Sequence, residues 1–132
     1  MNSTKYLERI GAELGPDSLN VETLRLLQRR HLLSVPFENL DIHWKRPIIL
    51  DLDRFYTKIV DERRGGFCYE LNGLFNELLL SLGFTTRLIS ARVGRPDGTF
   101  GAEFDHAAII VSIDGEEFLT DVGFGDFSAE PL

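Results

Sequence analysis

The hydrophobic pattern changes its period at Gly83, and this change constrains the fold more than any other feature of the chain. Before Gly83, apolar residues recur at the spacing of a buried helix face. After it, runs rich in β-branched residues alternate with turn residues, which indicates strands. We therefore expect an α+β fold, with an N-terminal helical bundle at 1–84 followed by antiparallel strands of a partial β domain at 85–132. The predicted strands are 85–95, 104–113 and 116–124.

Four helices are predicted, each bounded by residues that begin or end a helix. Asn20 can cap the second, which must end before Pro36 because a residue that precedes proline avoids the α region. The fourth begins at Cys68, is apolar enough to be largely buried, and ends at Gly83. The remaining two are expected from Ser3 or Thr4 to Gly15-Pro16, and from Asp51 to Gly65-Gly66.

Asp114-Gly115 is a strong two-residue turn signal between the last two predicted strands. If these residues form the turn, Ala108 faces Asp121 across the hairpin, and His106 lies on the same face as Ala108. His106 and Asp121 are then diagonal neighbours, with backbones roughly 7–8 Å apart and side chains within reach. A slip of one residue would place them on opposite faces.

Cys68 stands at a predicted helix start, directly after Gly65-Gly66-Phe67. The free N–H groups of a helix N-terminus carry partial positive charge, which stabilises the thiolate, the reactive form of cysteine. The two glycines allow close approach of the backbone and leave room for an acyl group. From the residues alone, the alternative that Cys68 is a small buried hydrophobic residue is about equally supported.

Cys68, His106 and Asp121 can supply a nucleophile, a base and a residue that orients the base. A lone histidine on an apolar strand is more often structural. The presence of Asp121 on the same predicted face favours a catalytic role for His106 over that structural alternative. Asp105 competes as the orienting residue, but it should point to the opposite face.

Composition excludes several other functions. The formal net charge of −7 and the pI near 4.9 give no basic surface for nucleic acid and no electrostatic attraction to an anionic membrane. One cysteine allows no internal disulfide, which fits a reducing compartment. No signal peptide or membrane-spanning run is found, so a cytoplasmic protein is expected. Because one cysteine and three dispersed histidines lack ligand spacing, we expect no metal and take His31 and His43 as structural or surface residues.

Residues 64–72 read Arg-Gly-Gly-Phe-Cys-Tyr-Glu-Leu-Asn, which resembles the active-site motif of the arylamine N-acetyltransferases. Segments 31–40, 105–106 and 121–125 are similar, in the same order, to that family's N-terminal signature and to its catalytic histidine and aspartate segments. The similarity spans nearly the whole chain, and four motifs in register are far more specific than one.

The resemblance implies a thiol-enzyme core related to papain and the transglutaminases. It also implies ping-pong chemistry, with acetyl-CoA as co-substrate and an aromatic amine or hydrazine as acceptor. Carried over by position, Cys68 takes the acetyl group, His106 is the base and Asp121 orients His106. Arg64 and Glu38 match positions expected to form a structural charge pair behind the site.

The same resemblance assigns residues to the substrates. Phe37 and Phe124 match aromatic positions that line the family's arylamine pocket, and Gly123 and Gly125 belong to the loop near the cofactor. For both phenylalanines, ordinary core packing is an equal alternative.

The length of the chain departs from the family, whose members are considerably longer and carry the rest of the β domain and a lid domain. We therefore expect an incomplete core that self-associates through an uncovered β edge. Three functions stay open: an acetyltransferase acting in xenobiotic metabolism, with turnover impaired by truncation; a thioester hydrolase, in which water replaces the amine; and a non-catalytic paralogue.

Overall fold

The computed structural model describes residues 1–16, 18–125 and 128–132. Helices precede a three-stranded antiparallel sheet of order β1-β2-β3, as the change of period predicted. The elements are α1 (Ser3–Ile10), α2 (Val21–Ser34), α3 (Leu40–His43), α4 (Leu52–Tyr56), the π-helix η1 (Thr57–Asp61), α5 (Cys68–Leu82), β1 (Thr85–Ala91), β2 (His106–Ile113) and β3 (Glu116–Thr120). Within the described residues, no helix combines the length and apolar character needed to cross a membrane.

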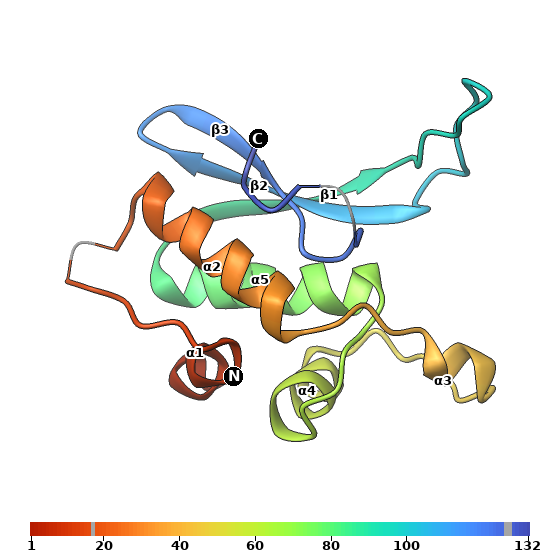
Figure 1. The fold of residues 1–132 in the computed structure, drawn as a ribbon, viewed down its shortest axis with the longest axis horizontal. Coiled ribbons are helices and arrows are strands. Elements are labelled where there is room, and N and C mark those ends of the chain that lie inside the picture. The colour runs from red at the N-terminus through yellow and green to blue at the C-terminus, as the bar shows by residue number, and fades with distance from the viewer. Residues whose placement is uncertain (17, 126–127) are drawn as a thin grey trace.

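The sheet covers one side of α5, and α1 and α4 lie on the opposite side (Figure 1). Phe75 and Leu78 of α5 are fully buried, and Ile109 and Val111 of β2 pack into the same core. One face of the sheet and one helix therefore share a single apolar core, which fixes where the first residue of α5 lies relative to the strands.

The predicted ends of α2 and α5 are confirmed. The Asn20 side chain accepts a hydrogen bond from the Thr23 N–H at the start of α2. Gly83 ends α5 in the left-handed conformation. The predicted bounds of the first helix were wrong, because Asn2 caps α1 and Gly11 ends it with φ 65°. The N–H groups of Gly11 and Ala12 turn back to carbonyls of the last turn, which satisfies them well before Gly15.

The predicted third helix begins after Asp51, whose side chain accepts from the Arg54 N–H. After one turn it widens into the π-helix η1, which the sequence pattern did not predict. The wider turn buries the consecutive residues Lys58, Ile59 and Val60. A charged side chain thus enters the interior beside two apolar ones, and the short helix α3 was also unforeseen.

The three strands are shorter than predicted. Each lacks residues at the same end of the sheet, where Ala91 pairs with His106. β1 ends at Ala91, β2 begins at His106, and β3 ends at Thr120. Phe104, expected in a strand, has φ 62° and cannot continue the ladder. His106 and the residue after β3 therefore lie at the same end of the hairpin.

Candidate active site

The hairpin brings His106 and Asp121 together as its register predicted. Asp114 and Gly115 have φ of 52° and 85°, the left-handed values of a two-residue turn. Ile110 pairs with Leu119, so the register is the expected one. The His106 Nε2 atom lies 2.5 Å from Asp121 Oδ2, and both side chains are buried. The predicted contact is confirmed.

Cys68 is the first residue of α5 and is half-buried. Burial lowers the pKa of His106, but hydrogen bonds with Asp121 and then Cys68 outweigh it and raise that pKa to about 9. Because Nε2 is engaged by Asp121, Nδ1 is the ring nitrogen left for the thiol. At neutral pH the imidazole ring is therefore positively charged and lies between a carboxylate and a sulfur. A positive charge in this position favours a thiolate.

Asn72 was not foreseen as part of this site. Its fully buried side chain donates from Nδ2 to Asp121 Oδ1 at 2.9 Å and to the Ala107 carbonyl at 2.6 Å. Its Oδ1 accepts from the Val122 N–H at 2.9 Å. Asn72 follows Cys68 by one helical turn, so α5 presents both to the strands. The available signal was a polar residue within an otherwise apolar stripe.

Two glycines are required by close approach around Cys68. A Cβ atom on Gly123 would lie 2.7 Å from the Cys68 Cα atom, and one on Gly65 would lie 2.0 Å from the Pro36 carbonyl oxygen. The Gly123 N–H also donates to Asp121 Oδ1 at 2.8 Å. Gly123, expected near the cofactor, therefore packs against the backbone of Cys68. Among the residues that the structure describes, no atom beyond its chain neighbours lies within 4 Å of the corresponding point on Gly125, whose φ is 80°.

Phe37 and Phe124 each border a surface hollow rather than the core, and the hollow at Phe124 also includes His106. They are 52% and 42% exposed, so the core-packing alternative is wrong for both. The Phe124 ring meets His106 edge-on, with ring centroids 5.0 Å apart. Phe124, His106 and Asp121 line a cavity of about 320 Å³, and Phe37 lines another of about 280 Å³ with Gly125.

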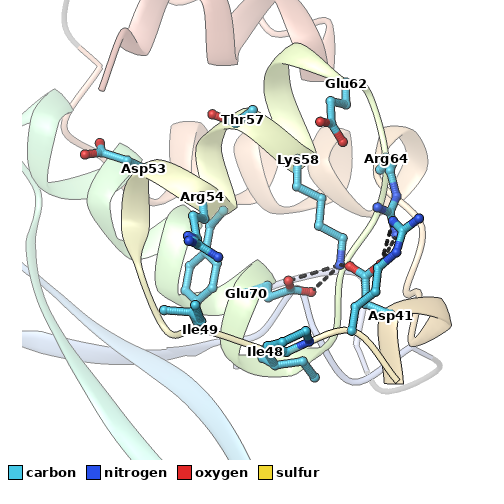
Figure 2. Close-up of a pocket in the computed structure, with 13 residues that line it drawn as sticks. Asp41, Ile48, Ile49, Asp53, Arg54, Thr57, Lys58, Glu62, Arg64 and Glu70 are labelled. Carbon is cyan, nitrogen blue, oxygen red and sulfur yellow. Dashed lines mark hydrogen bonds and ion pairs between the residues drawn. The ribbon is translucent and has the colours of Figure 1, made fainter. Parts of the chain in front are cut away.

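The expected charge pair of Arg64 and Glu38 is present and belongs to a larger network. Arg64 also contacts Asp41 at 3.0 Å, and Lys58 bridges Asp41 and Glu70 (Figure 2). These contacts raise the pKa of Arg64, with the bond to Glu38 as the largest cause. The network borders a cavity of about 420 Å³ to which Cys68 does not contribute.

The remaining histidines and Asp105 lie away from this chemistry. His31 is fully buried, with Nε2 2.9 Å from the Tyr6 hydroxyl, and His43 is exposed, as predicted for structural and surface residues. Asp105 is exposed and its carboxylate lies beside Gly101, whereas His106 Nε2 is engaged by Asp121. Among the described residues, no group of three or more potential ligands could hold a metal ion.

Comparisons with known proteins agree on one family. A family model described as N-acetyltransferase matches residues 20–132. The arylamine N-acetyltransferase of Escherichia coli (strain K12) is 39% identical over 120 residues, which are 91% of this chain and 42% of that protein. Proansamycin X synthase of Amycolatopsis mediterranei (strain S699) is 37% identical over 132 residues, covering 96% of this chain and 50% of that protein.

Solved structures give the same result. The structure of Mycobacterium marinum arylamine N-acetyltransferase in complex with CoA matches with a TM-score of 0.88 at 36% identity. That match covers 99% of this chain and 50% of the other. This chain thus spans about half the length of the proteins it resembles.

Proposed function

This chain belongs to the arylamine N-acetyltransferase family, and we propose that it transfers an acetyl group from acetyl-CoA to an aromatic amine or hydrazine through an acetylated Cys68. The observation that carries this proposal is the buried contact of His106 with Asp121 beside a cysteine at the start of α5. His106, with its pKa raised to about 9, is charged at neutral pH and favours the thiolate form of its partner.

In the first half-reaction, the Cys68 thiolate attacks the acetyl carbonyl carbon of the donor. A bond forms between Cys68 Sγ and that carbon, the bond from the carbon to the CoA sulfur breaks, and His106 gives its proton to the departing sulfur. Because one thioester replaces another, little free energy is lost in storing the acetyl group on Cys68.

In the second half-reaction, neutral His106 accepts a proton from the amine as the amine nitrogen attacks the acetyl carbon. The carbon–sulfur bond to Cys68 breaks, and Cys68 leaves as a thiolate beside protonated His106, which restores the starting state. Asp121 keeps the imidazole ring in place through both steps.

Phe37 and Phe124 are proposed to form walls for the aromatic acceptor, supported by the exposure of both rings and by the edge-on contact of Phe124 with His106. Gly123 and Gly125 are proposed to leave space for the acetyl donor next to Cys68, and the absence of described atoms within 4 Å of a Cβ position on Gly125 fits that role. The CoA in the Mycobacterium marinum structure supports a donor of this class.

We also propose that 1–84 contributes the nucleophile and 85–132 the base and its orienting carboxylate. A cytoplasmic location is proposed, because a reducing compartment keeps the single cysteine available as a thiol.

The test is the intact mass of the protein after incubation with acetyl-CoA and no acceptor. We expect a mass increase of one acetyl group, absent in Cys68→Ala, and transfer of that group to an added arylamine. An activated acetyl ester serves as a second donor, and labelling by the ester alone would contradict use of acetyl-CoA. Release of acetate without acetylated amine would indicate a hydrolase, and a folded sample that neither donor labels would overturn the proposal.

A further inference from the structure

Two side chains of α5 donate hydrogen bonds to the backbone on either side of His106. The Tyr69 hydroxyl donates to the Phe104 carbonyl at 2.5 Å, and Asn72 Nδ2 donates to the Ala107 carbonyl at 2.6 Å. Tyr69 and Asn72 are three positions apart near the start of the helix, so they lie on one face of it. The helix that begins with the candidate nucleophile therefore contacts the chain both before and after the candidate base.

The bond to Phe104 acts beyond the end of the sheet. The ladder between β1 and β2 ends at the pair of Ala91 with His106, and Phe104 lies two residues beyond that pair. Phe104 has φ 62°, a left-handed conformation that costs free energy in a residue other than glycine. Its side chain is 66% exposed, so the apolar core does not impose this conformation. The hydrogen bond from Tyr69 favours the conformation by holding the Phe104 carbonyl against α5.

Side-chain packing leaves a gap between the same two segments. Tyr69 and Gly73 of α5 border a hollow of about 240 Å³, and Phe104 and Ala107 border it from the segment that carries His106. Close packing therefore does not by itself set how near this segment comes to α5. The two hydrogen bonds join the segments here, one of them exposed and the other buried.

We infer that Tyr69 is a positioning residue which, together with Asn72, holds His106 within reach of the Cys68 thiol. Asn72 also donates to Asp121, whereas the Tyr69 hydroxyl acts on the backbone that leads into His106. Without that hydroxyl, His106 keeps Asp121, its partner within the hairpin, and moves away from Cys68, its partner on α5. The inference rests on the proposed function only in taking Cys68 and His106 as the reacting pair.

The contact between His106 and Cys68 can be measured through the titration of the histidine. Burial lowers the pKa of His106, and the ionisable groups Asp121 and then Cys68 raise it. Removing the thiol in Cys68→Ala should therefore lower that pKa, and the size of the fall reports how closely the two side chains interact. Comparing the fall in two backgrounds isolates this interaction from the effects of burial and of Asp121.

The test is a proton NMR titration of the His106 Hε1 signal from about pH 6 to about pH 11. In the otherwise wild-type protein, Cys68→Ala should lower the pKa of His106. Tyr69→Phe keeps the ring and its contact with Phe67, with ring centroids 6.2 Å apart, and removes only the hydroxyl. In that background, Cys68→Ala should lower the pKa by about half as much or less.

Tyr56→Phe is the matched control, because the Tyr56 hydroxyl also donates to a backbone carbonyl, that of Asn2, at 3.3 Å. It should leave the effect of Cys68→Ala at its wild-type size. A purely structural role for Tyr69 would lower stability in urea and leave the effect of Cys68→Ala unchanged. That result, or the lack of any effect of Cys68→Ala in the otherwise wild-type protein, would overturn the inference.

Substitutions of Phe104 test the other end of the bond. Asparagine tolerates the left-handed conformation, so Phe104→Asn should keep the full effect of Cys68→Ala. The β-branched side chain in Phe104→Val disfavours that conformation and should reduce the effect. Equal effects in these two variants would contradict the inference. Circular dichroism checks that each variant is folded, and if Tyr69→Phe unfolds, the pair at Phe104 decides.

The titration needs neither acetyl-CoA nor an amine. A reduced effect in Tyr69→Phe, in a protein that acetyl-CoA does not label, would therefore uphold this inference and contradict the proposed function. Labelling by acetyl-CoA together with an unchanged effect in Tyr69→Phe would do the reverse.

Discussion

At the scale of single residues, the two buried histidines differ in charge because their neighbours differ. His106 lies against a carboxylate and a thiol, which outweigh its burial, whereas His31 meets the hydroxyl of Tyr6 and the ring of Phe75. Burial, with a smaller contribution from the Arg9 charge, lowers the pKa of His31 to about 3. His31 is therefore neutral in the folded protein over a range in which the unfolded chain is protonated.

This difference predicts how stability depends on pH. Because the unfolded chain binds a proton at His31 below about pH 6.5 and the folded protein does not until about pH 3, the free energy of unfolding should fall by about 1.4 kcal/mol per pH unit on acidification through this window. Urea unfolding at several pH values measures the slope. In His31→Gln this contribution should disappear, whereas His43→Gln, at an exposed position, should keep it. Equal slopes in all three proteins would contradict the assignment.

At the scale of elements, the site depends on how closely the segment after β3 approaches α5. In Gly123→Ala the new Cβ atom would lie 2.7 Å from Cys68 Cα and 2.9 Å from Asn72 Nδ2, closer than real Cβ contacts. We expect a loss of about 1–3 kcal/mol in the free energy of unfolding and slower alkylation of Cys68, because backbone must move to relieve the overlap.

The matched control for that substitution is Gly15→Ala. A Cβ atom on Gly15 would meet no atom of the described residues within 4 Å, and the residue does not have positive φ. Its unfolding free energy should stay within about 0.5 kcal/mol of wild type. If both substitutions have equal effects in urea unfolding, the close approach at Gly123 is not what requires a glycine there.

At the scale of the whole molecule, one buried guanidinium joins three helical elements and the loop that leads to Cys68. Arg9 of α1 donates to the carbonyls of Ile59 in η1, at 3.0 Å, and of Ser34 at the end of α2, at 2.8 Å. It also donates to the carbonyls of Arg63 and Arg64. No carboxylate of the described residues joins these contacts, so the guanidinium acts through its several donors rather than through an ion pair.

Arg9→Met should therefore lower the free energy of unfolding by about 2–4 kcal/mol, because it removes the donor to one buried and three partly buried carbonyls. Arg9→Lys should recover only part of this loss, since one ammonium group cannot reach carbonyls arranged around a planar guanidinium. Thermal unfolding with Arg30→Met, at an exposed position of α2, provides the comparison. A loss no larger than that of Arg30→Met would show that the buried contacts add nothing to stability.

Features confined to one hairpin or one helix could be predicted from the sequence. The turn at Asp114-Gly115 sets the register, and the two-residue period of a strand then places His106 on the same face as Asp121. Likewise, the start of α5 at Cys68 follows from the local residues. Each of these depends on contacts between residues close in the chain, and a pattern of residue types specifies such contacts directly.

The tertiary structure alone decided which distant residues support that site. Asn72 reaches Asp121, Gly123 packs on Cys68, and Lys58 pairs with Glu70 only because separate elements dock at one place. Their partners lie 49, 55 and 12 positions apart in the chain, as the residue numbers give. No periodicity encodes such a distance, because it is set by the packing of the elements and by the π-helical turn that directs Lys58 inward.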